Sequence, residues 1–473
     1  MLASKVFGDK WTYPDVEITD ITIDSRTVKP GSTFVCITGE ITDGHNYAEA
    51  AEKAGAAVIV AEHEVSANVP VVVYENTKLA LAEISSKFYG EPEKDLKLVG
   101  ITGTNGKTTV SYLIKKILEI SGKTVGIIGT NEIIVGDCDV GIKSSTPTTP
   151  NSLELRKIFA KMSEMGAEYV VMEVSSLALE LHRVAGLCYE VGVFTNLTQD
   201  HLDYHKTMEN YFLAKKKLFN ISKVGVVNCD DEYGARILED TPCNVISVGV
   251  EKGDIFAKDI KIDAGGVEFS ASINEKLYPI SLAIPGLFSV YNGLCALGAA
   301  IALGISPDNA ASGLSKATGV KGRLERVPTD TDFSVLIDYA HTPDGLENVL
   351  NAVNSFKKGR CIVVFGCGGD RDKTKRPIMG KIATELSDIA IITSDNPRTE
   401  NPSDIIEDIL AGVTKNNRKV IENRKEAIAY ALKIAQKDDV VLLAGKGQET
   451  YQIIGKEKIH FDEREIVQEF LSK

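Results

Sequence analysis

The segment from Leu98 to Thr109, LVGITGTNGKTT, constrains the fold more than any other part of this chain. It runs from an apolar stretch through a glycine-rich turn into a stretch with apolar residues at helical spacing, from Val110 to Leu118. A strand, a glycine-rich turn and a helix in this order point main-chain N–H groups at an anion beside the helix N-terminus. The segment therefore predicts an α/β domain with a phosphate-binding loop.

Side chains of this loop suit a nucleotide with a metal ion. Lys107 can reach the β- and γ-phosphates, and the hydroxyl of Thr108 can bind Mg²⁺. The loop departs from the strict GxxxxGK[ST] pattern, because Ile101 stands where the first glycine would be. The residues expected to contact ATP are Gly103, Thr104, Asn105, Gly106, Lys107, Thr108 and Thr109. A glycine-rich turn without a ligand is the alternative, and motors, transport ATPases, GTPase switches, kinases and ligases all use such loops.

Further polar residues follow apolar stretches of the same region. Glu173 ends the apolar segment that begins at Tyr169, where a strand of an α/β sheet would present it to a ligand; an acid that merely ends a buried strand is the alternative. His201 lies in a segment rich in oxygen and imidazole groups, but a loop hydrogen bond explains this histidine as well as metal coordination does, because imidazole is not a preferred Mg²⁺ ligand. Lys215 begins a run of three lysines that by itself indicates a solvated helix face.

Composition narrows the class of protein. The 473 residues carry a formal net charge of −13, which disfavours nucleic acid and anionic membranes as partners. The eight cysteines form no CxxC pair, and we expect free thiols in a reducing cytoplasm. No apolar segment at the N-terminus resembles a secretion signal, and the apolar stretch from Leu294 to Ile305 is too short to span a membrane, so no membrane insertion is expected.

Changes along the chain predict three domains. The charged segment EPEKD at 91–95 indicates a linker before Lys97. The pattern of predicted strands and helices changes again near GRLE at 322–325. Strand-like runs at 361–365, 388–393 and 440–444 then alternate with helical stretches, as in a parallel sheet. The predicted domains are residues 1–96, 97–325 and 326–473.

The motifs GITGTNGKTT, MEVSS, TNLTQDHLDYH and AKKKLF, in this order, resemble those of the Mur ligases, the ATP-dependent amide-forming enzymes of peptidoglycan synthesis. The likeness continues through VYN at 290–292, GRLE at 322–325 and DYAHTPD at 338–344, and it covers nearly the whole chain. The resemblance implies an N-terminal uridine-nucleotide-binding α/β domain, a central P-loop ATPase-like α/β domain and a C-terminal Rossmann-like α/β domain. It also implies a cytoplasmic monomer.

The resemblance further implies how ATP is used. ATP would phosphorylate a substrate carboxylate, an amine would attack the acyl phosphate, and two Mg²⁺ ions would offset the charge. One ion would be held by Thr108 and Glu173, and the other by Glu173, His201 and Lys215 carbamylated to N6-carboxylysine. By the same likeness, Lys107, Glu173, His201 and Lys215 are catalytic, whereas Asn292 lies near adenine, Arg323 near the phosphates and Asp338 on the ribose. His341 is expected to shape the same crevice.

Two groups of residues match the family's contacts to a UDP-N-acetylmuramoyl dipeptide. Ser25, in TIDSR, matches the uridine-nucleotide site of members that add the third residue of the stem peptide, although the stretch alone indicates only a turn. Thr148, Thr149, Ser175 and Arg183 match contacts to the muramoyl dipeptide. Hydroxyls and a guanidinium suit a ligand with carboxylates and a pyrophosphate.

Three loops of the C-terminal region follow predicted strands and should meet at one edge of a sheet. They supply the amino-acid site that the resemblance implies: Arg371, Asp395, Asn396, Pro397, Arg398, Gly445 and Glu449. The sequence DNPR resembles the loop of family members that add meso-diaminopimelate, in which the arginine pairs with the far carboxylate. Glu449 suits the ammonium group of the ligand. A surface Asx-Pro turn is the alternative for residues 395–398, and an incomplete dinucleotide fingerprint is the alternative for the loop from Phe365 to Lys373.

The chain departs from the usual family pattern at Leu177 and at Gln448, where histidine is usual. These departures affect the surroundings of the dipeptide and amino-acid sites. A lysine-adding homologue should lack Arg398, and a folylpolyglutamate synthetase should lack residues 1–96. A P-loop ATPase without ligase activity would release phosphate without an acceptor.

Overall fold

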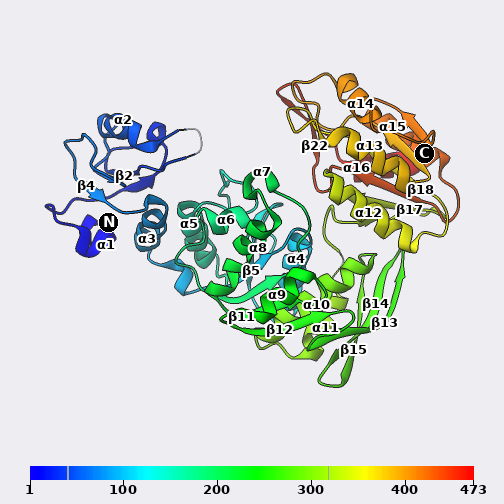
Figure 1. The fold of residues 1–473 in the computed structure, drawn as a ribbon, viewed down its shortest axis with the longest axis horizontal. Coiled ribbons are helices and arrows are strands. Elements are labelled where there is room, and N and C mark those ends of the chain that lie inside the picture. Colours follow the sequence, from blue (N-terminus) through cyan, green and yellow to red (C-terminus); the bar gives the residue numbers. More distant parts are fainter. Residues whose placement is uncertain (40–41, 318, 473) are drawn as a thin grey trace. The chain divides into compact units, whose positions relative to one another are not determined.

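The computed structural model describes residues 1–39, 42–317 and 319–472. These residues form two compact units. The first holds Met1–Ser247 with Gly298–Ile305, and the second holds Val248–Leu297 with the chain from Ser306 onward. The helices and strands carry the labels of Figure 1.

The N-terminal part of the first unit is a four-stranded parallel sheet of order β1-β2-β3-β4. Its elements are α1 (Ala3–Phe7), η1 (Gly8–Lys10), β1 (Asp20–Thr22), η2 (Ser25–Thr27), β2 (Ser32–Val35), η3 (Gly44–Tyr47), α2 (Ala48–Lys53), β3 (Val58–Ala61), β4 (Val71–Val73), α3 (Thr77–Phe88) and η4 (Pro92–Lys94). Successive residues of a strand point to opposite faces. Val58 and Val60 accordingly pack in one apolar cluster with residues of α1 and α3, whereas Ile59 and Ala61 pack in another with residues of α2.

The rest of the first unit is built on a larger sheet with the strand order β12-β11-β10-β5-β9-β6-β7-β8. Strands β11, β10, β5, β9 and β6 run parallel, and β7 and β8 are antiparallel additions. The elements are β5 (Lys97–Thr102), α4 (Lys107–Ile120), β6 (Val125–Ile128), β7 (Ile133–Val135), β8 (Cys138–Asp139), α5 (Ser152–Glu164), β9 (Tyr169–Glu173), α6 (Ser176–Glu180), β10 (Tyr189–Phe194), α7 (Leu202–His205), α8 (Met208–Lys216), η5 (Lys217–Ile221), β11 (Ser222–Asn228), α9 (Glu232–Glu239) and β12 (Asn244–Gly249).

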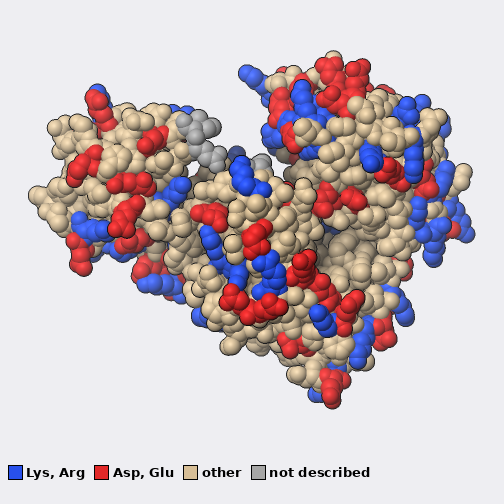
Figure 2. Space-filling view, viewed as in Figure 1, with Lys and Arg blue, Asp and Glu red and all other residues tan. Residues whose placement is uncertain are grey.

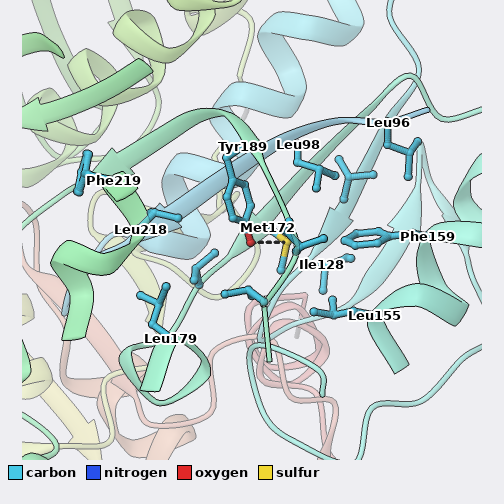
Figure 3. Packing of buried hydrophobic residues seen from close by; sticks show 14 of the residues in the cluster. Leu96, Leu98, Ile128, Leu155, Phe159, Met172, Leu179, Tyr189, Leu218 and Phe219 are labelled. Carbon is cyan, nitrogen blue, oxygen red and sulfur yellow. Dashed lines mark hydrogen bonds between the residues drawn. The ribbon is translucent and has the colours of Figure 1, made fainter. Parts of the chain in front are cut away.

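One face of this sheet is covered by a cluster of buried apolar residues, shown in Figure 3. Leu98 of β5 and Met172 of β9 pack there with Leu155 and Phe159 of α5. The hydroxyl of Tyr189, buried at the start of β10, donates a 3.4 Å hydrogen bond to the sulfur of Met172. This packing fixes the strands whose carboxyl ends carry the site described below.

The second unit begins with three antiparallel strands, followed by the greater part of one helix, up to Leu297, and by a second helix. These are β13 (Ile255–Asp263), β14 (Gly266–Ile273), β15 (Lys276–Leu282), α10 (Leu287–Ala302) and α11 (Pro307–Ser315). The apolar stretch near residues 294–305 thus covers the second half of α10 and the residues that follow it. None of the helices in the described part of the chain has the length and apolar character that a membrane span needs.

A six-stranded sheet of order β16-β17-β21-β18-β19-β20 completes the second unit (Figure 1). All neighbouring strands are parallel except β16 and β17. The elements are β16 (Glu325–Val327), β17 (Ser334–Asp338), α12 (Pro343–Phe356), β18 (Cys361–Phe365), α13 (Lys375–Leu386), β19 (Ile389–Ile392), α14 (Pro402–Leu410), β20 (Arg418–Val420), α15 (Arg424–Ile434), β21 (Val440–Ala444), β22 (Tyr451–Ile454), β23 (Glu457–His460) and α16 (Glu463–Leu471). Alternate residues of β17, β18 and β21 pack with residues of α15 and α16 in one apolar cluster.

The strands expected from apolar runs are confirmed. The runs at 361–365, 388–393 and 440–444 correspond to β18, β19 and β21, and the predicted strand, turn and helix around the phosphate loop is β5 followed by α4. On the face drawn in Figure 2, acidic and basic side chains are interspersed over the surface.

Candidate active site

The phosphate loop leaves β5 in a conformation that requires glycine. Gly103 has φ +150°, and a Cβ atom on it would lie 1.9 Å from Oγ1 of Thr195. The N-terminal cap of α4 is Gly106, which is left-handed with φ +87°. The end of β10 supports the loop, because the Thr195 hydroxyl donates a 2.6 Å hydrogen bond to the carbonyl of Asn105. The structure therefore contains the predicted phosphate loop. Its glycines lie at positions where a side chain would clash or strain the backbone.

Two lysines converge on this loop. Nζ of Lys107 donates to the carbonyls of Gly103 and Thr104 at 3.0 and 2.9 Å, and Nζ of Lys215 donates to the same Gly103 carbonyl at 2.8 Å. Lys215 is buried, and burial together with the neighbouring charge of Lys107 holds its pKa well below the usual range. The solvated helix face considered for Lys215 is therefore wrong.

Glu173 lies buried at the end of β9 with both carboxylate oxygens engaged. Oε1 accepts hydrogen bonds from the Thr108 hydroxyl at 2.8 Å and from the main-chain N–H of Thr130 at 3.0 Å. Oε2 accepts from the Thr130 hydroxyl at 3.1 Å. A Cβ on Gly129 would lie 2.5 Å from Oε1, so glycine is needed beside the carboxylate. Thr130 was not expected from the sequence, although its place at the end of β6, next to β9, is the signal that could have found it.

These groups suit a magnesium ion. The hydroxyl of Thr108 and the carboxylate of Glu173 are oxygen donors, which Mg²⁺ prefers, and they already lie within hydrogen-bonding distance of each other. Among the described residues, no group of three His, Cys, Asp or Glu side chains is placed to hold a metal ion. His201 lies on the surface with Nε2 3.5 Å from Asp200, whereas the buried histidine of this segment is His205, whose Nε2 is 2.8 Å from the Ser176 hydroxyl.

The residues expected to contact the muramoyl dipeptide adjoin Glu173. The Thr148 hydroxyl is 2.9 Å from that of Thr130. The Thr149 hydroxyl donates to the carbonyl of Glu173 at 2.9 Å and accepts from the Ser175 N–H at 3.0 Å. Arg183 donates to the Thr149 carbonyl at 3.0 Å. The structure thus brings Thr148, Thr149, Ser175 and Arg183 to the same end of the sheet as the phosphate loop.

Ser25 lies in the N-terminal part of the first unit, as the first residue of η2. The turn is held by Asp24, which accepts hydrogen bonds from the main chain and side chain of Arg26. These bonds lower the pKa of Asp24 to about 2.

In the second unit, Asp338 ends β17 and Asn292 is buried on α10. The Asp338 carboxylate accepts from the N–H groups of Leu324 and Ala340 at 2.7 and 2.8 Å, while burial raises its pKa. The guanidinium of Arg323 lies 5.1 Å from the centre of the Tyr339 ring. Asp338 and Arg323 are therefore neighbours at the end of β17.

The three loops predicted to share one ligand do meet. Nη1 of Arg398 donates to the Gly369 carbonyl at 2.7 Å, and Nδ2 of Asn396 donates to Oε2 of Glu449 at 2.9 Å. Gly445 has φ +116°, and a Cβ there would lie 2.7 Å from Oδ2 of Asp395. Asp395, Asn396 and Pro397 are buried, whereas Arg371 is exposed and donates to the carbonyl of Asp370 at 3.0 Å. The exposed Asx-Pro turn considered for residues 395–398 is thereby excluded.

Arg398 is also fixed through its main chain. It is left-handed, with φ +50°. Its N–H donates to the carbonyl of Ile453 at 3.1 Å, and its carbonyl accepts from the N–H of Gly455 at 2.7 Å. The β22–β23 hairpin that makes these contacts was not foreseen from the sequence.

Buried ion pairs surround the three loops. Arg424 and Glu463, at the starts of α15 and α16, are fully buried and 2.8 Å apart, and Arg424 also donates to the carbonyl of Ala444 at 2.8 Å. Arg376 of α13 is buried and binds both oxygens of Glu400, which lowers the pKa of that carboxyl to about 2. Lys446, between Gly445 and Gly447, is likewise buried.

Comparisons with known proteins find matches along nearly the whole chain. Three family models match in succession: the Mur ligase family catalytic domain at residues 17–89, the Mur ligase middle domain at 101–300, and the Mur ligase glutamate ligase domain at 322–447. Among curated proteins, UDP-N-acetylmuramoyl-L-alanyl-D-glutamate–2,6-diaminopimelate ligase 1 of Clostridium acetobutylicum is 50% identical over 464 residues, covering 97% of this chain and 96% of its own. The corresponding ligase of Caldanaerobacter subterraneus subsp. tengcongensis is 49% identical over 466 residues, with the same coverage of 97% and 96%.

Solved structures also resemble this chain. A UDP-N-acetylmuramoyl-L-alanyl-D-glutamate–2,6-diaminopimelate ligase superposes with a TM-score of 0.74 at 29% identity, covering 100% of this chain and 99% of that one. A folylpolyglutamate synthase of Mycobacterium tuberculosis superposes with a TM-score of 0.63 over 78% of this chain and 92% of its own, at 17% identity, which is a likeness of fold alone. The expected three α/β domains are confirmed, and the chain belongs to the Mur ligase family.

Proposed function

We propose that this chain is an ATP-dependent ligase that adds meso-diaminopimelate to the D-glutamate γ-carboxylate of UDP-N-acetylmuramoyl-L-alanyl-D-glutamate. The observation that carries the proposal is the junction of three loops in the second unit. Arg398 and Asn396 of one loop donate hydrogen bonds to Gly369 of the second loop and to Glu449 of the third. Relatives at 50% and 49% identity carry the name of this activity.

The reaction requires two transfers. The γ-phosphoryl group passes from ATP to an oxygen of the D-glutamate γ-carboxylate, which yields ADP and an acyl phosphate. The amine of the incoming amino acid then attacks the acyl carbon, loses a proton, and expels inorganic phosphate as the amide forms. In this scheme the N–H groups of the loop from Gly103 to Thr109 surround the ATP phosphates, and Lys107 offsets their charge. The roles expected for Asn292, Arg323 and Asp338 toward ATP, and for Ser25 toward uridine, stay predictions.

Magnesium belongs to this proposal. The hydroxyl of Thr108 and the carboxylate of Glu173 would hold it, and Mg²⁺ supplies positive charge that lets a carboxylate approach a polyanionic phosphate. A second ion held by Glu173, His201 and a carbamylated Lys215 is proposed with it. Carbamylation requires a neutral amine to attack CO₂, and the lowered pKa of the buried Lys215 favours that form.

Selectivity follows from the chemistry of the amino acid. Meso-diaminopimelate carries a second carboxylate that L-lysine lacks, and a guanidinium binds a carboxylate through two parallel hydrogen bonds. Bound lysine would leave Arg398 without that partner, which disfavours it strongly. We also propose a cytoplasmic site of action, supported by the eight free cysteines, and a monomeric state.

The test offers meso-diaminopimelate and L-lysine in parallel to the wild-type protein with ATP, Mg²⁺ and UDP-N-acetylmuramoyl-L-alanyl-D-glutamate, and measures product mass and phosphate release. A tripeptide product with diaminopimelate alone is expected. A lysine product would keep the ligase and overturn the role of Arg398. Phosphate release that does not depend on an amino acid would instead indicate a P-loop ATPase without ligase activity.

A further inference from the structure

Lys446 is a buried cation at the centre of the three-loop junction. It lies two residues after β21 and is 0% exposed. Its Nζ donates to the carbonyl of Tyr451 at 2.8 Å, to Oδ1 of Asn396 at 3.0 Å and to Oε2 of Glu449 at 3.3 Å. Oδ1 of Asp395 lies 3.6 Å away. An ammonium group has three protons, so these contacts use its full donor capacity.

These contacts determine how Asn396 is oriented. Its Oδ1 accepts from two donors, Nζ of Lys446 and the N–H of Ile453, both at 3.0 Å. Because both donors require an oxygen, the amide nitrogen must point the other way, toward Oε2 of Glu449 at 2.9 Å. The amide therefore has one orientation, and Lys446 supplies one of the two bonds that enforce it.

The same cation determines where Glu449 lies. Oε2 of Glu449 receives hydrogen bonds from both Lys446 and Asn396, and the side chain is 16% exposed. Oε2 of Glu449 and Oδ1 of Asp395 lie 3.3 and 3.6 Å from the same ammonium, so its removal takes away the cation that the two carboxylates share. Like charges repel strongly when they are partly buried, so Glu449 would turn toward solvent.

On these grounds we infer that Lys446 is a positioning residue of the amino-acid site, which holds Asn396 and Glu449 in the arrangement that receives the ammonium group of the incoming amino acid. The inference rests on the proposed function, because it assumes that this site takes an amino acid. Lys446 acts through its neighbours Asn396 and Glu449, neither of which is among the residues expected to contact ATP, so its removal changes the affinity for the amino acid more than that for ATP.

The test compares Lys446→Met, which keeps the length of the side chain, and Lys446→Gln, which keeps a donor without the charge. KM for meso-diaminopimelate, KM for ATP and kcat are measured separately, with thermal melting to identify folded protein. We expect KM for diaminopimelate to rise at least about 10-fold in both variants, because losing the hydrogen bonds of Lys446 frees the side chains of Asn396 and Glu449. KM for ATP should change less than about twofold.

The matched control is Arg360→Met. Arg360 pairs with Asp439 at 2.6 Å, and both precede strands of the same sheet, β18 and β21, at the ends remote from the three loops. The Arg360→Met substitution removes an ion pair from the same sheet but leaves the three-loop junction unchanged. KM for diaminopimelate should therefore stay at the wild-type value.

Each outcome decides the matter. A folded Lys446 variant with unchanged KM for diaminopimelate overturns the inference, as does a loss of kcat alone, which a merely structural role would produce. Failure of both variants to fold also overturns it, because the lysine is then required for the fold. If the wild-type protein forms no product with diaminopimelate, the proposed function fails before any variant is compared.

Discussion

The hydroxyl of Thr108 donates a 2.8 Å hydrogen bond to Oε1 of Glu173, which joins the first turn of α4 to the end of β9. Thr130, at the end of β6, binds both oxygens of the same carboxylate. The phosphate loop and its acid are therefore fixed to each other by contacts within the protein.

Replacing Glu173 with glutamine should remove activity while keeping the fold. The amide keeps an oxygen that can accept from Thr108 and Thr130, but it has no charge with which to hold Mg²⁺. We expect kcat to fall about 100-fold or more, as it does when a charge that stabilises the transition state is removed. Glu168→Gln, at an exposed acid just before the same strand, is the control and should keep normal activity. Normal activity in Glu173→Gln would contradict the proposed magnesium site.

Lys215 should react with CO₂ in the native protein. In ¹³C NMR with ¹³C-bicarbonate, the wild type should show a carbamate signal that is absent from Lys215→Arg, because the guanidinium is always protonated. Lys216→Arg is the comparison, since Lys216 pairs with Asp240 at 2.6 Å, whereas Lys215 is buried against the phosphate loop. A carbamate signal that persists in Lys215→Arg would refute this assignment.

Truncating Arg398 should weaken the use of meso-diaminopimelate. Arg398→Ala removes the guanidinium proposed to bind the far carboxylate, and kcat/KM for diaminopimelate should fall about 100-fold or more. The selectivity against L-lysine should fall with it. Arg418→Ala, at an exposed arginine of β20 in the same sheet, should change neither value. Equal losses for both amino acids would mean that Arg398 supports the loop only.

The buried pair of Arg424 and Glu463 should tolerate joint replacement better than the loss of one partner. Arg424→Met leaves a buried carboxylate without its cation, which costs about 3–5 kcal/mol. The double variant Arg424→Met, Glu463→Leu should recover most of that stability, as measured by scanning calorimetry. A double variant as unstable as the single one would show that the pair itself stabilises this unit.

The ion pair of Glu400 predicts a dependence of stability on pH. Arg376 lowers the pKa of Glu400 from 4.5 to about 2 in the folded protein. The folded state therefore binds fewer protons than the unfolded state between these values, so the stabilisation is present above pH about 4.5 and is lost as the pH falls toward 2. The melting temperature of wild type should exceed that of Glu400→Gln at pH 6, and the gap should narrow below pH about 4.5 and close only toward pH 2. A gap that stays constant with pH would exclude this cause.

The sequence predicted the site best where the residue types and their spacing are typical of one local structure. The phosphate loop, the strand that ends at Glu173 and the strand that ends before Asp395 were all predictable, because apolar runs followed by polar residues mark the carboxyl ends of parallel strands. Their neighbours in space were not predictable. Thr130 lies 43 residues from Glu173 in the sequence, and only the strand order β9-β6 brings the two together.

Lys446 shows a second reason why some residues of the site could not be predicted from the sequence. A lysine between two glycines in a loop looks exposed, since long charged side chains are rarely buried. Its burial depends on acceptors contributed by three separated positions, Asn396, Glu449 and Tyr451, and no local pattern reveals that they converge. The lysine run at 215–217 was ambiguous for the same reason, because Lys215 is buried while Lys217 is not.

The left-handed backbone of Arg398, held on both sides by the β22–β23 hairpin, has a consequence for protein engineering. Residues 395–398 carry the side chains of the site, but the conformation of Arg398 is dictated by residues more than fifty positions later in the chain. A transplant of the tetrapeptide alone into a related scaffold would transfer the side chains but not the backbone conformation of Arg398. The transferable module is the tetrapeptide together with residues 445–460, and chimeras should be cut accordingly.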